Sequence, residues 1–355
     1  MQRHGGNVWL AQQTYGITAN ELIDFSANIN PLGPSPRAME ALERTKAYIR
    51  HYPEPQAETL RLKLASLWNL PEDMIIVGNG AAELIYALGR VLRPRRVLLP
   101  VPTFSEYAES FAEQERIAIY LKRDNYFSLQ PEKLYPLLEP ENLLVICNPN
   151  NPTGQLINRV ELRGLLEQAK EKATWVLLDE AFMDFVQPQQ SLLEELSLYP
   201  NLIIVRSLTK MYALPGLRLG YLAAAPQIIK KLYKTLPPWR VNVLAQAAGL
   251  ASLQDQAYFN QTLALVNRQK EFLVNALAAI PGLTPLPAAA NFILVECRNS
   301  GFTAAAIKDY LAPRGILLRL CHNFEGLDEH YFRVAVRTEG ENHKLLQNLQ
   351  QFLKD

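Results

Sequence analysis

The chain has 355 residues, of which 48% are hydrophobic and 20% are charged, and its formal net charge is +1. That length can bury a large core and favours one large unit with a smaller one beside it. The near-neutral charge gives no electrostatic case for binding a nucleic acid or a membrane surface. We therefore expect the partner to be a small molecule.

The ends and the cysteines indicate the cell compartment. Residues 1–7 lack the apolar core of a secretion signal, and no run of about 18 apolar residues occurs in the sequence. The three cysteines, Cys147, Cys297 and Cys321, are scattered beside apolar runs. Their spacing matches neither a metal site nor a disulfide framework. We expect a reduced, cytoplasmic protein with buried thiols and no bound metal.

The first 48 residues read as an arm without regular elements, because a Gly-rich start is followed by a stretch rich in Pro and Asn at 24–34. Beyond the arm, short apolar runs alternate with helix-like stretches. We predict helices at 57–69 and 81–92, and strands at 74–77, 96–101, 118–121, 143–147, 174–178 and 202–205. Apolar strands that alternate with helices indicate an α/β unit, here 49–253, with a parallel sheet covered on both faces.

The remaining residues predict a smaller α+β unit at 254–355. A long amphipathic stretch covers 256–280, and residues 281–287 are rich in Pro and Gly and end it. The larger unit ends with predicted helices at 227–236 and 242–253. In the smaller unit, helices are predicted at 304–311 and at the end of the chain, and strands at 291–296, 316–321 and 331–336.

Polar side chains follow four of the predicted strands, and in a parallel sheet ligands collect beyond the carboxyl ends. Lys210 ends one buried strand, where poor solvation disfavours the ammonium form and leaves an amine able to attack a carbonyl. Ser207, Thr209 and Arg218 offer donors to a phosphate. An aldehyde that carries a phosphate and is held by a lysine describes pyridoxal phosphate. Taken alone, the stretch fits equally well a strand and a polar turn with a solvated lysine.

Four other strand ends have two interpretations each. Asp179 follows four apolar residues and, if buried, needs a cation, either a protonated pyridine nitrogen or an arginine. Asn151 lies in a rigid Asn-Pro-x-Asn-Pro-Thr-Gly loop and is aimed at a cofactor hydroxyl, unless the loop is only a tight turn. Ala81 and Ala82 begin a helix whose free N–H groups can hold a phosphate, although any strand-to-helix turn can contain glycine. Phe104 either stacks on the cofactor ring or packs in the core.

Basic and terminal residues suggest an anionic substrate. The last two predicted strands contain or directly precede three arginines, Arg319, Arg333 and Arg337. These arginines are either edge residues or anion ligands. His4 and Gly5 belong to a terminus that is floppy or folds as an anion-binding loop, because glycine adopts backbone shapes barred to other residues. Tyr52 is either a core residue or a phosphate ligand.

Together these motifs resemble a known family. The order Asn-Pro-x-Asn-Pro-Thr-Gly, Asp-Glu-Ala, Ser-x-Thr-Lys and Gly-Leu-Arg-x-Gly resembles the aspartate aminotransferase superfamily, the fold-type I pyridoxal phosphate enzymes, over nearly the whole chain. Residues 4–7, 25–33 and 332–338 resemble the histidinol-phosphate aminotransferase branch and, more closely, the threonine-phosphate decarboxylases of the cobalamin pathway.

The resemblance implies a role for each candidate residue. Lys210 is the lysine that binds the cofactor covalently, Asp179 pairs with the pyridine nitrogen, Asn151 reaches the ring hydroxyl and Phe104 covers the ring. The cofactor phosphate is expected to contact Ala81, Ala82, Ser207, Thr209, Arg218 and, from the second subunit of a homodimer, Tyr52. The substrate is expected to contact His4, Gly5, Asn28, Asn151, Arg319, Arg333 and Arg337.

The activity that the resemblance implies is decarboxylation of O-phospho-L-threonine. Phe182 stands where the aminotransferases commonly have a tyrosine on the ring hydroxyl, and this weakens a plain aminotransferase interpretation. A histidinol-phosphate aminotransferase remains an alternative, because the same groups bind any phosphorylated amine. A non-catalytic ligand sensor is a further alternative, disfavoured because the sequence shows no basic helix-turn-helix extension.

Overall fold

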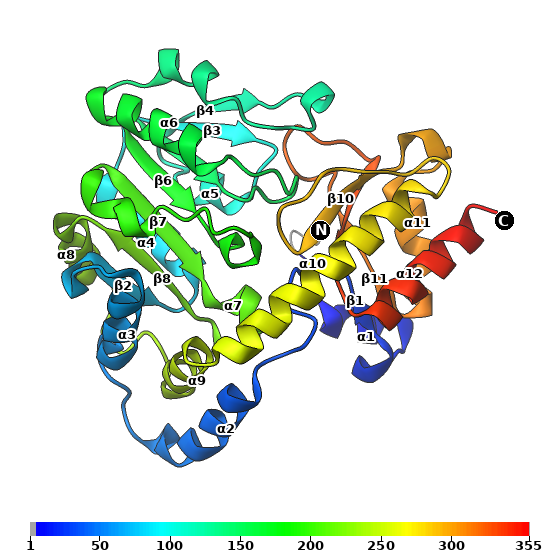
Figure 1. Ribbon diagram of the computed structural model, residues 1–355, viewed down its shortest axis with the longest axis horizontal. Helices are drawn as coiled ribbons and strands as arrows, with labels where there is room; N and C mark the ends of the chain where they lie inside the picture. Colours follow the sequence, from blue (N-terminus) through cyan, green and yellow to red (C-terminus); the bar gives the residue numbers. More distant parts are fainter. Residues whose placement is uncertain (1–4, 355) are drawn as a thin grey trace.

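Three β-sheets organise residues 5–354, the part of the chain that the computed structural model describes (Figure 1). The largest sheet has seven strands in the order β2-β8-β7-β6-β5-β3-β4. These strands are β2 (Ile75–Gly78), β3 (Arg96–Val101), β4 (Glu115–Tyr120), β5 (Leu143–Cys147), β6 (Trp175–Asp179), β7 (Leu202–Ser207) and β8 (Gly220–Ala224). Only β8 runs against its neighbours, so the other strands end at one common edge. The predicted α/β class is confirmed, with one antiparallel strand added.

The large sheet has a separate core on each face, because successive side chains of a strand point to opposite sides. Leu177 packs with the helices of one face, whereas Val176 and Leu178 pack with those of the other. The first face carries α4 (Ala81–Leu92), α5 (Glu106–Ser110) and α8 (Pro226–Thr235), and the second α3 (Glu58–Trp68), α6 (Arg159–Glu171) and α9 (Val243–Leu253). Burial on both faces explains why these strands are apolar throughout.

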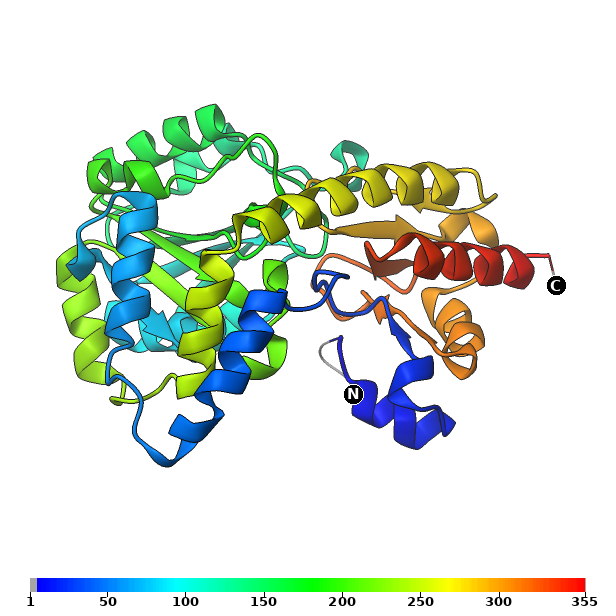
Figure 2. The ribbon, with the colours of Figure 1, turned by 60° about the horizontal axis from the view of Figure 1, so that its bottom comes forward.

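The C-terminal part forms a four-stranded antiparallel sheet in the order β12-β13-β10-β9. Its strands are β9 (Thr284–Pro285), β10 (Phe292–Glu296), β12 (Arg319–Leu320) and β13 (Tyr331–Ala335). Its helices are α10 (Gln256–Ala278), α11 (Ala304–Leu311) and α12 (Glu339–Phe352). In Figure 2 the long helix α10 starts beside the large sheet and runs along the C-terminal sheet.

The arm has more regular structure than the sequence analysis expected. It contains α1 (Val8–Tyr15), β1 (Ile23–Asp24) and α2 (Pro36–Thr45). The Ser35 side chain accepts a hydrogen bond from Ala38 N, and Pro36 opens the helix, so a helix-start signal was present in the sequence. The stretch rich in Pro and Asn is irregular after β1, as expected, but the expectation of an arm without regular elements is wrong.

The structure differs from the prediction at two further places. Residues 316–321 form two short strands in different sheets, β11 (Ile316–Leu317), which pairs with β1, and β12. Strand β8 was not predicted, because a Gly-Leu-Arg-x-Gly stretch is typical of a loop. Gly220 opens β8 where a side chain has no room, since a Cβ there would lie 2.5 Å from Ala81 N.

Two expectations from composition can be compared with the fold. The three cysteines are free and buried, as predicted. Within residues 5–354, no helix has the length and apolarity that crossing a membrane demands.

Candidate active site

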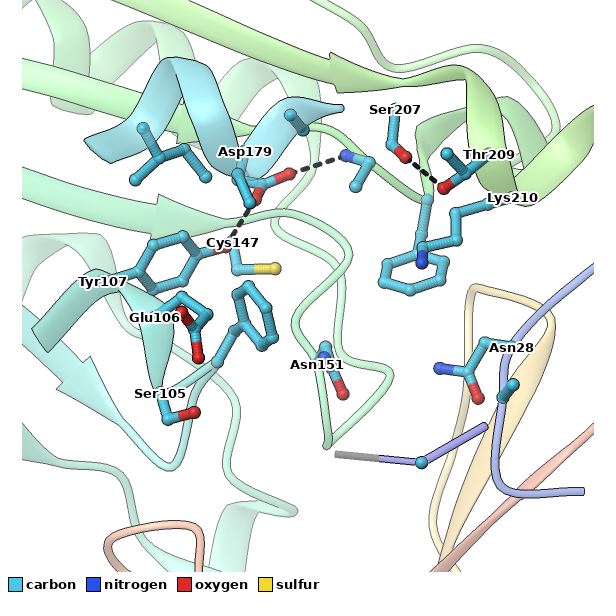
Figure 3. Close-up of a pocket in the computed structure, with 18 of the residues that line it drawn as sticks. Asn28, Ser105, Glu106, Tyr107, Cys147, Asn151, Asp179, Ser207, Thr209 and Lys210 are labelled. Atoms are coloured by element: carbon cyan, nitrogen blue, oxygen red, sulfur yellow. Dashed lines mark hydrogen bonds between the residues drawn. The ribbon is translucent and has the colours of Figure 1, made fainter. Parts of the chain in front are cut away.

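A cavity of about 440 Å³ lies at the common edge where β5, β6 and β7 end, and the arm and the C-terminal sheet close its other side (Figure 3). Most residues predicted to carry function line it. They are Gly5, Asn28, Ala81, Ala82, Phe104, Asn151, Asp179, Ser207, Thr209, Lys210, Arg218, Arg319 and Arg333.

Two predicted residues of the described chain are not among those lining the cavity. Tyr52 has 83% of its surface exposed and stacks against Trp239, with ring centroids 5.0 Å apart. Arg337 donates a 2.6 Å hydrogen bond to Glu341 Oε1. His4 lies outside the described residues.

Lys210 enters the cavity from α7 (Leu208–Met211), the short helix that follows β7 directly. Its Nζ lies 5.9 Å from the centre of the Phe182 ring. Burial, helped by the charges of Arg218 and Arg333 and opposed by that of Asp179, lowers the pKa of Lys210 from 10.5 to about 8. About a tenth of this amine is therefore uncharged at pH 7, far more than for an ordinary lysine, and is able to attack a carbonyl.

The low pKa of Lys210 predicts how the cofactor-free protein captures an aldehyde. Only the uncharged amine reacts, so the capture rate is expected to rise with pH and level off above about pH 8. An ordinary lysine would continue to gain rate up to about pH 10. The measurement is the rate at which absorbance near 420 nm develops after pyridoxal phosphate is added, between pH 6 and 10. A rate that still climbs tenfold per unit above pH 9 would contradict the assignment.

Asp179 ends β6 and is 4% exposed. Its Oδ2 accepts a 2.7 Å hydrogen bond from the Tyr107 hydroxyl and its Oδ1 a 2.8 Å bond from Ala181 N (Figure 3). Burial raises the pKa of Asp179, and the two hydrogen bonds oppose that rise because they favour the carboxylate. The site thus holds an oriented, buried carboxyl group that a protonated ring nitrogen would stabilise as an anion.

The Asn-Pro-rich loop 148–154 divides its asparagines between structure and cavity. Asn148 bridges the backbone of Ile157, accepting at 2.8 Å and donating at 3.0 Å. Asn150 donates to Pro102 O and to Thr153 Oγ1, both at 2.9 Å. Asn151 lines the cavity, where its Oδ1 accepts a hydrogen bond from Arg333. The loop is therefore a turn stabilised by the hydrogen bonds of Asn148 and Asn150, and it also places Asn151 in the cavity.

One end of the cavity is an anion cradle. Helix α4, which is 12 residues long, begins there at Ala81 and directs free N–H groups toward it. Ser207 Oγ and Thr209 Oγ1 lie 2.7 Å apart beside it. Gly80 has φ +85°, and a Cβ at this residue would lie 2.6 Å from Arg218 Nη2, so only glycine lets the guanidinium approach.

The opposite end is formed by two arginines in direct register. Arg319 on β12 pairs with Arg333 on β13, so like charges face each other across neighbouring strands, which is unfavourable without an anion. Burial lowers the pKa of Arg319, and it lowers that of Arg333 to about 10. In the described chain, the buried atoms Asn28 Oδ1 and Arg333 Nε have no hydrogen-bond partner. A negatively charged ligand would satisfy Arg319 and Arg333, the pair that we call the arginine wall, whereas Asn28 Oδ1 is an acceptor and needs a donor such as an amine.

The arm connects the two ends of the cavity. Ser26 O accepts a 2.8 Å hydrogen bond from Arg333 Nη2. Asn30 N donates to Lys210 O at 3.0 Å, and Asn30 Nδ2 donates to Met211 O at 2.9 Å. Gly5 packs so closely that a Cβ there would lie 2.1 Å from Ser26 O. The irregular stretch after β1 therefore holds both the arginine wall and the lysine helix.

Sequence reasoning missed Tyr107, Cys147 and Ser26. Tyr107 lies three residues after Phe104 at the end of β3, so the strand-end rule that selected Phe104 pointed to its neighbourhood. Cys147 was assigned only as a buried thiol, and it is the neighbour of Asp179 across the β5–β6 pair. Ser26 acts through its backbone carbonyl, and no pattern of side chains announces such a contact.

The donor set suits pyridoxal phosphate. The cradle of Ala81, Ser207, Thr209 and Arg218 matches a phosphate, the Lys210 amine matches an aldehyde, and the Asp179 carboxyl matches a protonated ring nitrogen. Phe104 lies in the same lining and offers an aromatic face. The cofactor needs no contact with the arginine wall, so Arg319 and Arg333 remain to bind the negative charge of a second molecule.

Comparison with known proteins identifies the group to which these features belong. The profile of the family described as aminotransferase class I and II matches residues 20–349. Threonine-phosphate decarboxylase of Salmonella typhimurium is 35% identical over 353 residues, which cover 99% of this chain and 96% of that protein. Histidinol-phosphate aminotransferase of Symbiobacterium thermophilum is 37% identical, with coverage of 93% and 90%.

The same two activities appear among similar solved structures. L-threonine-O-3-phosphate decarboxylase from Porphyromonas gingivalis superimposes with a TM-score of 0.85 at 29% identity, covering 93% of this chain and 99% of that one. Histidinol-phosphate aminotransferase from Clostridium acetobutylicum superimposes with a TM-score of 0.87 at 29% identity, covering 94% of this chain and 99% of that one, so the fold is shared by proteins of both activities.

Proposed function

Because the chain belongs to the aminotransferase class I and II family, whose cofactor is pyridoxal phosphate, we propose that it decarboxylates O-phospho-L-threonine. The products are (R)-1-amino-2-propanol O-2-phosphate and carbon dioxide, and the family resemblance places this reaction in cobalamin biosynthesis. The observation that carries the proposal is the opposed pair Arg319 and Arg333 in the cavity that also contains Lys210 and Asp179.

When bound, the cofactor would supply an electron-accepting ring that could take up the electrons of one bond at the substrate Cα. The residues of the chain decide which bond this is. Arg319 and Arg333 hold the phosphate, and Asn28 adds a polar atom from the arm, so rotation about Cα is fixed. Asp179 stabilises positive charge at the ring nitrogen. The Lys210 amine lies in the same cavity and returns a proton to Cα.

We assign the arginine wall to the phosphate. A carboxylate held by a bidentate arginine is stabilised in the ground state, which raises the barrier to losing it as carbon dioxide. A phosphate is unchanged by the reaction, so tight binding of this group orients the substrate without opposing the chemical step.

The alternative is an aminotransferase that acts on histidinol phosphate, and the 37% identity to such an enzyme favours it. Against it stands Phe182, which is buried and packs edge-on against Phe292 with centroids 4.9 Å apart. A phenylalanine offers no hydroxyl to the cofactor ring, so the electron demand of the ring differs from that in the aminotransferases.

A direct assay separates the two activities. Holoenzyme incubated with O-phospho-L-threonine alone is expected to release one carbon dioxide per amine formed, without any 2-oxo acid. Histidinol phosphate with 2-oxoglutarate is expected to give no glutamate. If only the second mixture turns over, the aminotransferase is the function. O-phospho-L-serine belongs in the same experiment, because one methyl group is worth only about 1 to 3 kcal/mol of discrimination.

We further propose a cytoplasmic homodimer. Tyr52 is exposed beside Trp239, as expected for a residue that reaches the cofactor phosphate of a second subunit. In each subunit, residues 49–253 bind the cofactor, residues 254–355 contribute the arginine wall, and the arm 1–48 packs against both. We propose His4 and Gly5 as further contacts of the substrate anion, whereas Arg337 is paired with Glu341 and does not line the cavity.

A further inference from the structure

Tyr107 is a buried residue to which the proposed mechanism gives no role. It lies on α5 and has no exposed surface. Its hydroxyl donates to Asp179 Oδ2 at 2.7 Å, and its ring meets that of Phe104 edge to face, with centroids 5.6 Å apart and an interplanar angle of 83°. One side chain therefore touches the two residues expected at the nitrogen and at the face of the cofactor ring.

We propose that Tyr107 is a positioning residue that orients the Asp179 carboxylate and supports the Phe104 ring, so that both meet the cofactor ring in the right geometry. The proposal rests on the proposed cofactor-binding role of the cavity. It is independent of which phosphorylated amine the enzyme uses.

The hydrogen-bond geometry fixes the carboxylate of Asp179. Each of its oxygens accepts one bond, from Tyr107 on one side and from Ala181 N on the other, so the plane of the group cannot turn freely. A carboxylate has about four lone-pair sites, and two remain for a ligand. Without the hydroxyl, one oxygen would lose its partner in a buried site, which is costly and invites rotation.

Of the three neighbouring groups Tyr107, Cys147 and Asp179, only Asp179 carries a negative charge near pH 7. Burial, helped by the charge of Asp179, raises the pKa of Tyr107 well above 10 and raises that of Cys147, so both stay neutral near pH 7. Lys210 lowers the pKa of Asp179 and the neighbouring Glu180 raises it. The Tyr107 hydrogen bond is the largest influence that opposes burial at Asp179. Removing it therefore raises the pKa of that carboxyl.

The test is Tyr107→Phe, which removes the hydroxyl and keeps the ring against Phe104. We expect the dissociation constant of pyridoxal phosphate, measured without substrate by absorbance, to rise about tenfold, the effect of losing one hydrogen bond to a charged group. The acidic limb of the absorbance titration of the bound cofactor should move to higher pH, because the carboxyl of Asp179 loses the bond that lowers its pKa. With substrate, kcat should fall while KM stays within about twofold, because the Tyr107 hydroxyl is bonded to Asp179 and acts through it.

Two comparisons make the outcome decisive. Tyr221→Phe removes another buried hydroxyl, which accepts a 2.8 Å bond from Trp68 Nε1 outside the cavity, and it should leave the cofactor constants unchanged. In an Asp179→Asn background, Tyr107→Phe should add less than twofold to the dissociation constant, because the two residues act through one contact. Equal constants for wild type and Tyr107→Phe, or full additivity in the double variant, would overturn the proposal. A wrong substrate assignment would change neither substrate-free measurement.

Discussion

Lys210→Ala is expected to abolish turnover, by more than about 1000-fold, because the amine both holds the cofactor and returns the proton to Cα. Its lowered pKa and its place at the end of β7 make it the strongest nucleophile candidate in the cavity. In wild type, borohydride should fix the cofactor on the peptide that contains Lys210. In the variant, no absorbance near 420 nm and no trapped peptide should appear.

Lys270→Ala is the matched control. Lys270 is also partly buried, burial lowers its pKa as well, and its Nζ donates to Ala289 O at 3.1 Å. It does not line the cavity, so its variant should keep the absorbance and the trapped peptide. Turnover that survives in Lys210→Ala would refute the covalent role. A wild type that binds the cofactor but converts no amine would favour a ligand sensor.

The second large effect concerns stability. Arg206 is 2% exposed at the end of β7, and it pairs with Glu180 Oε2 at 2.8 Å and with Asp184. Arg206→Met would leave two buried carboxylates without their cation. We expect the free energy of unfolding of the cofactor-free protein to fall by about 3 to 5 kcal/mol. Denaturant unfolding followed by circular dichroism measures this change.

Arg44→Met is the control for that experiment. The Arg44–Glu40 pair, with a separation of 3.2 Å, lies on the exposed face of α2, so water screens it and its loss should cost less than about 1 kcal/mol. Equal losses in the two variants would show that the buried cluster contributes no more than a surface pair. Because Glu180 follows Asp179 and Arg206 precedes Ser207, the cluster also braces the strand ends that carry the cavity residues.

The functional residues at the strand ends were predictable from sequence because charged side chains there follow directly after apolar strands. Asp179 and Lys210 each follow an apolar run, and a charged residue in that place needs a reason. The parallel-sheet rule then brings these ends together without any knowledge of the packing. The same rule placed Asn151, although it could not tell which asparagines of its loop brace the turn.

Other features depended on contacts that sequence spacing does not encode. Tyr107 meets Asp179 across 72 residues, and the direct register of Arg319 with Arg333 follows from how β12 and β13 pair. Arg337 would share the face of Arg333 if the strand continued, but β13 ends at Ala335 and the side chain turns to Glu341 of α12. A pattern of alternating residues cannot show where a strand stops.

The arm links the two halves of the cavity through a short segment of backbone. Ser26 O accepts a hydrogen bond from Arg333 on β13, and Asn30 donates hydrogen bonds to the backbone of Lys210 and Met211 in α7. Only three residues separate Ser26 from Asn30. This link contains a tight turn, in which Ile29 N donates to Ala27 O at 2.9 Å. The arginines that face the substrate and the backbone of the lysine that faces the cofactor are therefore held by the two ends of one short piece of chain.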